Sequence, residues 1–376
     1  MKDLKLKKRG KKILFVTHNL NYEGASLWLF NLANGLKKRG HHVEILSPCT
    51  GPIEPFYLKE KIKINVSNYS FQNFNLLNFG KKFDSFVVNT IMGYKFIKNL
   101  NFEKRKVVWC LHESERDFYL KHFKDLDKKL FSQVNKVVFS SVSTKKVYEE
   151  LNTKDNFFII NTVGDWSKID KFIQKKTKKN VMMSKGFNKN DFLVNIIGTI
   201  CLRKGQLEFT EVAIEILKKL KNPQLKFVMI GGGRGYEYEK AIVKLIRLSG
   251  LQDQIIIVNE TKDIFNYYFI SDIFVCNSYI EAFPMVILEA MAFSLPIVST
   301  DAYGIAEQLE DEKSGFLIMP GDKETLRKKI MFLIKNKDIA KKLGKNARKR
   351  LEEKFSYEKM IDQYDALISE VCHKNE

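Results

Sequence analysis

Two carboxylates eight residues apart are the side chains of this sequence best suited to bind a hydroxyl-rich ligand. Glu281 and Glu289 stand in the stretch 278–292, and every residue between them is apolar. An ionised carboxylate accepts up to about four hydrogen bonds, and those bonds are charge-assisted. The alternative is that Glu281 complements a helix dipole and Glu289 lies on a solvated helix face. The apolar neighbours of Glu289 favour a functional role.

The elements around these carboxylates place them at a ligand-binding edge. The run 272–276 has the β-branched and aromatic bias of a buried strand, and Pro284 predicts a helix start near Phe283. Glu281 then lies on a strand-to-helix loop, and Glu289 lies inside the helix. Ligands bind beside such loops in open α/β sheets, and the free N–H groups of a helix start favour an anion such as a diphosphate.

A second loop supplies positive charge. The segment 198–206 follows the apolar run 193–197, precedes an amphipathic helix and contains Arg203 and Lys204. Cations held in place beside a departing diphosphate stabilise the negative charge that develops on it. The alternative is a solvated basic loop, which is common in a chain with 64 lysines and arginines.

The stretch 278–292 resembles the paired-glutamate motif of the family 4 glycosyltransferases, which are retaining enzymes of the GT-B fold. The resemblance continues through 292–301, 304–307 and 315–322, although Ser294 stands where a glycine is usual and 302–304 keeps one glycine of a common pair. It implies that Glu281 contacts hydroxyls of the donor sugar and that Glu289 binds the ribose. It also implies that sugar and phosphate face the backbone of Phe283, Pro284, Met285 and Val286.

The same resemblance assigns groups outside this motif. Lys204 matches the family's diphosphate-binding lysine, whereas the family's arginine is replaced by Thr199, so Arg203 is the candidate to take its place. His112, after the predicted strand 107–111, matches a histidine that faces the donor sugar; a structural histidine is the alternative. No side chain stands out as a general base. The resemblance implies that none is needed, because in this family the departing phosphate oxygen is thought to take the acceptor proton.

Two glycine-containing loops are further candidates for the donor site. Gly24 precedes a predicted helix, and Ala25 occupies the place of the family's second glycine. Gly232 belongs to a glycine-rich turn, 231–235, which lacks the spacing of a dinucleotide fingerprint because Tyr236 follows where a glycine is required. The resemblance places this turn near the nucleotide. The alternative is that its glycines only allow the chain to turn tightly.

Other polar residues are less suitable as parts of a functional site. His18 ends a predicted strand and is a weaker candidate than His112 for the same role. Asp125 and Asp127 have the spacing of a metal motif from another glycosyltransferase fold, but their lysine-rich surroundings indicate a solvated surface helix. Five widely spaced cysteines argue against disulfides and zinc. We therefore expect neither a metal nor a cofactor, and the nucleotide sugar, such as a UDP-sugar or GDP-sugar, is the substrate.

Apolar runs alternate with helical patterns along the whole chain, which predicts an α/β architecture with parallel sheets. The lysine-rich stretch 168–180 is the expected linker. We expect two Rossmann-like domains facing each other across a cleft, residues 1–170 binding the acceptor and residues 171–354 binding the donor. The segment 355–376 contains an amphipathic helix, which the resemblance predicts to cross back to the first domain. The predicted strands are 13–17, 43–47, 86–89, 107–111, 136–139, 157–160, 193–197, 226–230, 255–258, 272–276, 297–300 and 315–318.

The leading hypothesis is a metal-independent hexosyltransferase acting on a saccharide or lipid-linked saccharide. The alternatives are a sugar-nucleotide epimerase of the same fold and a nucleic-acid-binding protein that uses the net charge of +20, although no nucleic-acid motif is present. The N-terminus lacks the apolar core of a signal peptide, so we expect a cytoplasmic protein. The basic tail and the segment 116–124 suggest peripheral contact with an anionic membrane, and a plain surface helix is the alternative.

Overall fold

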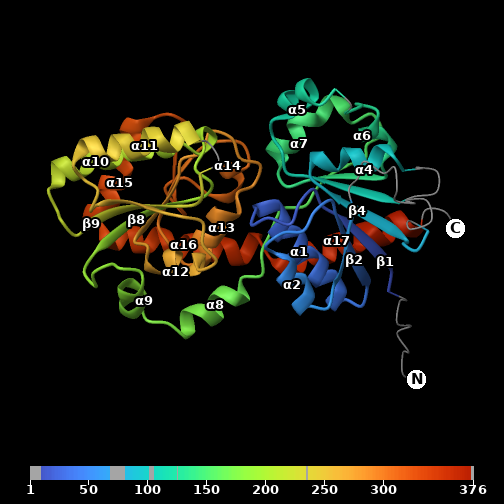
Figure 1. Ribbon diagram of the computed structural model, residues 1–376, viewed down its shortest axis with the longest axis horizontal. Coiled ribbons are helices and arrows are strands. Elements are labelled where there is room, and N and C mark those ends of the chain that lie inside the picture. Colours follow the sequence, from blue (N-terminus) through green and yellow to red (C-terminus); the bar gives the residue numbers. More distant parts are fainter. Residues whose placement is uncertain (1–9, 68–80, 101–105, 125, 234–235, 374–376) are drawn as a thin grey trace. The chain divides into compact units, whose positions relative to one another are not determined.

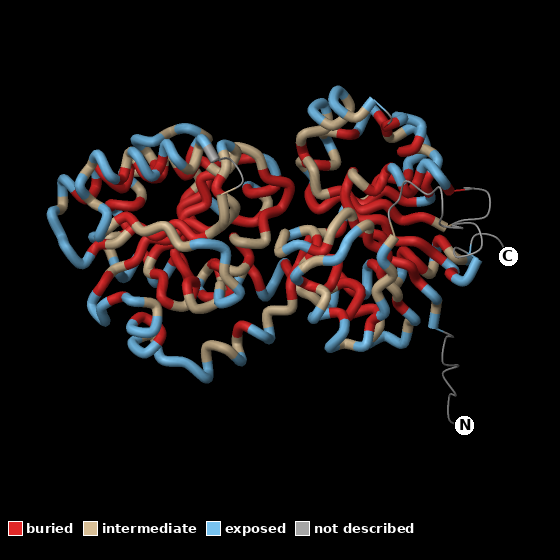
Figure 2. Tube along the Cα trace, in the orientation of Figure 1, coloured by how far each residue is buried: buried red, intermediate tan, exposed pale blue. Residues whose placement is uncertain are grey.

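The computed structural model describes residues 10–67, 81–100, 106–124, 126–233 and 236–373. The chain forms two units: residues 1–164 with 357–376, and residues 165–356. Each unit has a central parallel sheet whose strands are the most buried part of the backbone (Figure 2). Among the described residues, no helix combines the length and the apolar character needed to cross a membrane.

The first unit is built on a seven-stranded sheet in the order β3-β2-β1-β4-β5-β6-β7, and every pair is parallel. Its central strands β4 and β5 are buried along their whole length and are rich in valine and aromatic residues, as is usual for strands covered on both faces. The strands are β1 (Lys12–Val16), β2 (His42–Ser47), β3 (Lys63–Val66), β4 (Ser85–Asn89), β5 (Val107–Leu111), β6 (Lys136–Phe139) and β7 (Phe157–Ile159). The helices are α1 (Gly24–Lys38), α2 (Glu54–Lys59), α4 (Tyr94–Lys98), α5 (Arg116–His122), α6 (Leu130–Gln133), α7 (Val142–Tyr148) and α17 (Tyr357–His373), with short 3₁₀ turns η1 (Ile91–Gly93) and η3 (Glu149–Leu151).

The last helix, α17, completes the first unit. It packs against α1 and β4 (Figure 1). Trp28 of α1 donates its ring N–H to the sulfur of Met360, and a Cβ added to Gly35 would lie 2.3 Å from Ile361 Cδ1. Its buried face consists of the residues whose helical spacing predicted it: Met360, Ile361, Tyr364, Leu367, Ile368 and Val371.

The second unit has a six-stranded parallel sheet in the order β10-β9-β8-β11-β12-β13. Figure 1 shows α10, α11 and α15 on one face of this sheet and α12 and α16 on the other. The strands are β8 (Phe192–Ile197), β9 (Leu225–Ile230), β10 (Ile255–Val258), β11 (Ile273–Cys276), β12 (Ile297–Thr300) and β13 (Phe316–Ile318). The helices are α8 (Ser167–Gln174), α9 (Lys178–Ser184), α10 (Gln206–Leu220), α11 (Tyr236–Ser249), α12 (Ile264–Ile270), α13 (Met285–Ala292), α14 (Ile305–Gln308), α15 (Lys323–Lys335) and α16 (Lys337–Lys354), with the 3₁₀ turn η4 (Leu202–Lys204).

The stretch 168–180 is not a linker, so that expectation was wrong. It lies in α8 and the start of α9, and both helices belong to the second unit. Ile169 is buried, and the ring of Phe172 packs edge-on against Phe269 and Phe293 at centroid distances of 5.7 and 6.1 Å. The apolar residues of α8 recur at helical spacing, which positions them on one face while the lysines remain in solvent.

Candidate functional site

The sheet of the second unit reverses its winding direction between β8 and β11. From β8 the chain proceeds to β9 and β10, whereas from β11 it proceeds to β12 and β13 on the opposite side. The loops after β8 and β11 therefore leave the sheet side by side at its carboxyl edge, which is where open α/β sheets bind ligands. Hydrogen bonds join these loops, among them Tyr279 N to Arg203 O at 2.8 Å and Asn277 Nδ2 to Gly205 O at 2.9 Å.

Three charged side chains meet at this point. The ammonium of Lys204 forms an ion pair with Glu281 Oε1, and Arg203 Nη1 lies 3.3 Å from the same oxygen. Arg203 Nη1 also donates to the backbone oxygen of Ile280 at 3.0 Å. Burial by itself would raise the pKa of Glu281, but the positive charges of Lys204 and Arg203 outweigh it and hold that pKa below its ordinary value. Glu281 is therefore an ionised, buried acceptor.

Two glycines that sequence reasoning did not select shape the cationic loop. Gly205 has a φ of +65°, and a Cβ there would lie 2.3 Å from the backbone oxygen of Asn277. Gly198 has a φ of +146°, and a Cβ there would lie 3.6 Å from Lys204 Cε. Gly205 lets the two loops approach each other closely, and Gly198 supplies a positive φ that residues with a side chain rarely adopt. Their positions, at the end of β8 and just before α10, were the features of the sequence from which these two glycines could have been selected.

The helix after Glu281 begins two residues later than predicted. Helix α13 starts at Met285, and Pro284 is its N-cap with φ −67° and ψ 122°, rather than a residue inside the first turn. The extended ψ angle keeps Pro284 outside the helix. Its backbone oxygen accepts a hydrogen bond from Gln308 Nε2 at 3.0 Å. Phe283 is buried against the ring of Phe355, with a centroid distance of 5.5 Å.

The backbone around this helix start remains available to an anion. Met285 and Val286 are half-buried and occupy the first turn, where N–H groups have no partner inside a helix. A phosphate oxygen is a suitable acceptor for them, because the positive end of the helix dipole adds to the hydrogen bonds.

Glu289 lies in α13, away from the cations of η4. Its Oε2 accepts a hydrogen bond from the hydroxyl of Tyr268 on α12 at 2.7 Å. Burial raises the pKa of Glu289 to about 7, and the Tyr268 hydroxyl opposes part of this rise. Tyr268 was not selected from the sequence, because α12 is mostly aromatic and apolar and its tyrosines look like core residues.

The glycine-rich turn follows β9 and lies against the loop that follows β8. Gly231 has a φ of +155°, and a Cβ there would lie 2.1 Å from the backbone oxygen of Gly198. Gly232, the selected glycine, lies beside the carboxylate of Glu260, 3.5 Å from the position of an added Cβ. The strongest steric requirement for glycine is therefore at Gly231, and residues 234–235 of the turn lie outside the described residues.

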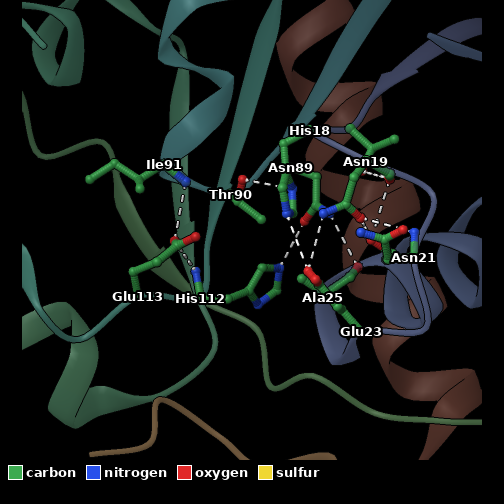
Figure 3. A network of polar contacts seen from close by, with 12 residues as sticks. His18, Asn19, Asn21, Glu23, Ala25, Asn89, Thr90, Ile91, His112 and Glu113 are labelled. Atoms are coloured by element: carbon green, nitrogen blue, oxygen red, sulfur yellow. Dashed lines mark hydrogen bonds and ion pairs between the residues drawn. The ribbon is translucent and has the colours of Figure 1, made fainter. Parts of the chain in front are cut away.

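His112 belongs to a polar network in the first unit (Figure 3). Its Nε2 lies 3.1 Å from Asn89 Oδ1, while Asn89 Nδ2 donates to the backbone oxygen of Ala25 at 3.1 Å. Because the Asn89 oxygen accepts, Nε2 carries the proton of the neutral ring and Nδ1 is the acceptor. Nδ1 lies 3.5 Å from Thr162 Oγ1, and the ring packs edge-on against Trp28 at 4.6 Å. Burial, with a smaller effect from His18, lowers the pKa of His112 to about 3.

Glu113 fixes the backbone beside His112 and was missed in the sequence. Its Oε2 accepts hydrogen bonds from the backbone N–H groups of His112 at 2.9 Å and of Ile91 at 3.1 Å (Figure 3). Burial raises the pKa of Glu113 to about 7 against these two hydrogen bonds. It lies two residues after the end of the buried strand β5, and this position was the only indication in the sequence.

Gly24 begins α1, and His18 lies on the loop that joins β1 to this helix. Gly24 is the first residue of that helix, and a Cβ there would meet open space among the described residues beyond its own helix and chain neighbours. His18 lies 3.2 Å from Thr90 Oγ1 through Nδ1 and 3.5 Å from Glu23 Oε2 through Nε2 (Figure 3). The fold thus gathers Gly24, His18 and His112 near one edge of the first unit, through Asn89 and Thr90.

The aspartate pair near residue 126 gives no evidence of a metal site. Asp125 lies outside the described residues, and Asp127 Oδ1 accepts from the backbone N–H of Lys129 just before α6. The expected surface helix is absent at Asp127, which lies in irregular structure. No group of three or more metal-ligating side chains occurs in the described part of the chain.

The fold and these loops define a two-sheet α/β protein with the architecture of the GT-B glycosyltransferases. Residues 177–350 match the family model of the glycosyl transferases group 1, and residues 9–179 match that of the glycosyl-transferase family 4. The chain therefore belongs to the group 1 glycosyltransferases of family 4 type, as the paired glutamates indicated.

Individual proteins agree with this assignment. An uncharacterized glycosyltransferase of Haemophilus influenzae is 25% identical over 379 residues, covering 95% of this chain and 100% of the relative. The capsular polysaccharide biosynthesis glycosyltransferase CapM of Staphylococcus aureus is 25% identical over 248 residues, 64% of either chain. The crystal structure of Anabaena HepE in complex with UDP superposes with a TM-score of 0.82 over 96% of this chain and 100% of HepE, at 20% identity. This structural likeness establishes the fold.

Proposed function

We propose that the protein is a retaining glycosyltransferase that moves a hexose-type sugar from a nucleotide diphosphate donor, such as a UDP-sugar or GDP-sugar, to a saccharide or lipid-linked saccharide. The observation that carries the proposal is the meeting of Lys204, Arg203 and Glu281 at the point where the second sheet reverses its winding direction. Such a donor brings both a diphosphate for the cations and hydroxyls for the carboxylate.

Each group has a distinct role in the proposal. Lys204 acts as a compact point charge on the diphosphate, and Arg203 with its planar guanidinium binds phosphate oxygens beside it. The first N–H groups of α13 add donors to the same anion. Glu281, which is ionised and buried, accepts from hydroxyls of the sugar, and Glu289 accepts from the ribose. Gly24, Gly232 and His112 are the remaining proposed site residues. His112 would accept a hydrogen bond from the donor sugar through Nδ1.

The chemistry follows from the charges. The acceptor oxygen forms a bond to the anomeric carbon while the bond from that carbon to the diphosphate oxygen breaks. The departing oxygen takes the proton of the acceptor hydroxyl, which keeps attack and departure on one face of the sugar. Lys204 and Arg203 stabilise the charge that accumulates on the diphosphate, so the proposed reaction requires no metal ion.

The relatives support the class of acceptor and donor. CapM acts in capsular polysaccharide biosynthesis, and HepE has been crystallised with UDP. We further propose a role in cell-surface polysaccharide or glycoconjugate synthesis, carried out in the cytoplasm at the inner face of the membrane, where lipid-linked acceptors lie.

Helix α5 is the proposed contact with an anionic membrane. None of its residues is buried, and Phe118 is 53% exposed beside Lys121 and His122. An exposed aromatic ring flanked by basic side chains suits the boundary between lipid head groups and acyl chains. Phe118→Ser should reduce co-sedimentation with vesicles containing phosphatidylglycerol and leave the low binding to neutral phosphatidylcholine vesicles unchanged. Equal binding of both proteins to both vesicles would contradict this contact.

A nucleotide-sugar screen tests the enzymatic proposal. We expect one or a few UDP-sugars or GDP-sugars to raise Tm, because a ligand that binds only the folded state stabilises it. The donor that does so is then incubated with EDTA and with lipid-linked saccharide acceptors, and the product linkage is determined by NMR. A product with the anomeric configuration of the donor supports the proposal. An inverted product, loss of activity in EDTA, or conversion of the donor to an isomer without any acceptor would each contradict it.

A further inference from the structure

Tyr268 is a buried tyrosine whose only polar atom points at a residue of the proposed donor site. It lies on α12 with no exposed surface, between the rings of Phe274 and Phe293. The ring is nearly parallel to that of Phe293, with an interplanar angle of 8° and a centroid distance of 5.5 Å. Phe293 itself follows α13 directly, and its backbone N–H donates to the backbone oxygen of Glu289. The Tyr268 ring therefore packs against a residue that is hydrogen-bonded to the backbone of Glu289.

The hydroxyl of Tyr268 reaches one oxygen of the Glu289 carboxylate and leaves the other to a ligand. It donates to Oε2 at 2.7 Å. No other hydrogen bond to the Glu289 side chain occurs within the described residues. A carboxylate with one oxygen tied to a rigid donor can turn only about that bond, so the lone pairs of Oε1 point in a restricted range of directions.

We propose that Tyr268 is a positioning residue that orients Glu289 for the ribose of the donor and thereby makes the site selective for a ribonucleotide. The inference rests on the proposed function, in which Glu289 accepts from the ribose hydroxyls. A ribose presents two adjacent hydroxyls as donors, whereas a 2′-deoxyribose presents one. An acceptor that is held in place discriminates between them more strongly than one that can turn away, because the missing donor leaves a carboxylate oxygen unpaired beneath the bound nucleotide.

The alternative is that Glu289 only satisfies the buried hydroxyl of Tyr268. A buried tyrosine needs a hydrogen-bond partner, and a carboxylate from the adjacent helix is adequate for that purpose. The two explanations differ in what happens when the hydroxyl alone is removed. If its role is structural, Tyr268→Phe changes stability and affects all nucleotides alike. If it positions Glu289, the ratio of affinities for ribose and deoxyribose nucleotides changes.

Binding calorimetry on the full chain measures this ratio. The probes are UDP with 2′-deoxy-UDP and 3′-deoxy-UDP, and GDP with its two deoxy counterparts, used in parallel. The proteins are the wild type, Glu289→Gln, Tyr268→Phe and Tyr267→Phe. Tyr267→Phe is the matched control, because it removes a hydroxyl from the neighbouring position of α12, for which the structure shows no bond to Glu289. Circular dichroism and Tm verify that each variant is folded.

We expect the wild type to bind the ribonucleotide about tenfold or more tightly than at least one deoxy counterpart. Tyr268→Phe should reduce this preference by about three- to tenfold, which is the usual range for one hydrogen bond, and Tyr267→Phe should keep it. Glu289→Gln should remove most of it.

The other outcomes contradict either the role of Tyr268 alone or the role of Glu289 as well. A full preference retained in Tyr268→Phe, or equal weakening of ribo and deoxy nucleotides, overturns the inference while Glu289 keeps its proposed role. A wild type without the preference, a preference that survives Glu289→Gln, or no binding of either nucleotide series overturns the proposed role of Glu289, and with it the inference.

Discussion

Lys204 and Glu281 are 77 residues apart in sequence and form an ion pair across the two loops at the centre of the second sheet. Arg203 lies beside the same carboxylate oxygen, so two positive side chains share one negative one and the cluster keeps an excess of positive charge. A nucleotide diphosphate would compete with Glu281 for both cations, and a sugar hydroxyl would compete with the cations for Glu281. The proposed donor, which carries both a diphosphate and hydroxyls, would supply new partners to all three side chains.

Replacing Lys204 with alanine should reduce kcat by about 10²- to 10³-fold, because one fixed charge beside the leaving group is lost. The measurement is turnover of the donor found in the nucleotide-sugar screen. Lys218→Ala, at an exposed position of α10, is the matched control and should leave kcat unchanged. A Lys204→Ala variant with near-normal turnover would remove Lys204 from the catalytic machinery.

The free energy of unfolding should depend on pH through Glu289. Burial raises the pKa of this carboxyl from 4.5 to about 7 in the folded protein, so the folded state binds more protons than the unfolded state between these values. The contribution of Glu289 to stability is complete below about pH 4.5 and is lost as the pH rises through about 7. Glu289→Gln, which keeps an acceptor for Tyr268, should raise Tm relative to the wild type increasingly from pH 5 to pH 8.

For Glu281→Gln, we expect the opposite dependence of stability on pH. The cations hold the pKa of Glu281 below its ordinary value, so its stabilising contribution is present above the unfolded value and is lost on acidification. This variant should have a lower Tm than the wild type at pH 7, and the difference should shrink towards pH 3. Parallel pH profiles for the two glutamine variants would contradict the two assignments.

His112 should stay neutral throughout the range in which most histidines titrate. Burial lowers its pKa to about 3, and the Asn89 amide oxygen accepts from Nε2 without supplying a negative charge. Asn89→Asp adds that charge, so the pKa of His112 should rise by one unit or more, as is usual for a carboxylate within hydrogen-bond distance. NMR titration of the ring carbon shifts measures it. Asn65→Asp, a charge added on the edge strand β3, should leave the His112 signals unmoved, and a wild-type His112 that titrates near pH 6.5 would contradict the assignment.

Ser294 stabilises the end of α13 less well than glycine would. It has a φ of +56°, its N–H donates to Met291 O at 2.9 Å, and Leu295 N–H donates to Ala290 O at 3.0 Å. This is the helix-ending geometry in which glycine is preferred, because it has no Cβ to strain. Ser294→Gly should increase the free energy of unfolding by about 0.5–1 kcal/mol in urea denaturation. Gly344→Ala should decrease it, because the new Cβ would lie 2.0 Å from Ser294 O.

The strands were predictable because both sheets are parallel and covered on both faces. Such strands consist of continuous apolar runs, as in 107–111 and 255–258, which the structure reproduces residue for residue. Strand β3 was missed because it lies at the edge of its sheet and reads Lys-Ile-Asn-Val, with polar residues that an exposed edge tolerates. The linker was misassigned because lysine content was given more weight than the helical spacing of Ile169 and Phe172.

The sequence predicted the loops of the candidate site separately, but not the contacts between them. The positions of Lys204 and Glu281 after two strands implied a shared sheet edge, but their direct contact depends on the order of strands, which the sequence does not state. Tyr268 and Asn89 act through a single hydrogen bond to another candidate, and each lies in a segment that resembles ordinary core. Residues that act through a neighbour carry no motif of their own, so three-dimensional contacts are needed to find them.

The return of α17 to the first unit affects how the protein is made. Residues 165–356 are synthesised between the two parts of that unit, so a ribosome adding ~5–20 residues per second exposes the first part for on the order of ten seconds before α17 exists. During this interval Trp28 and Gly35 have no Met360 or Ile361 to cover them. The second unit, whose segments are contiguous, is complete earlier. The first unit, although its synthesis begins first, therefore cannot complete its packing on α17 until after the second unit has been synthesised.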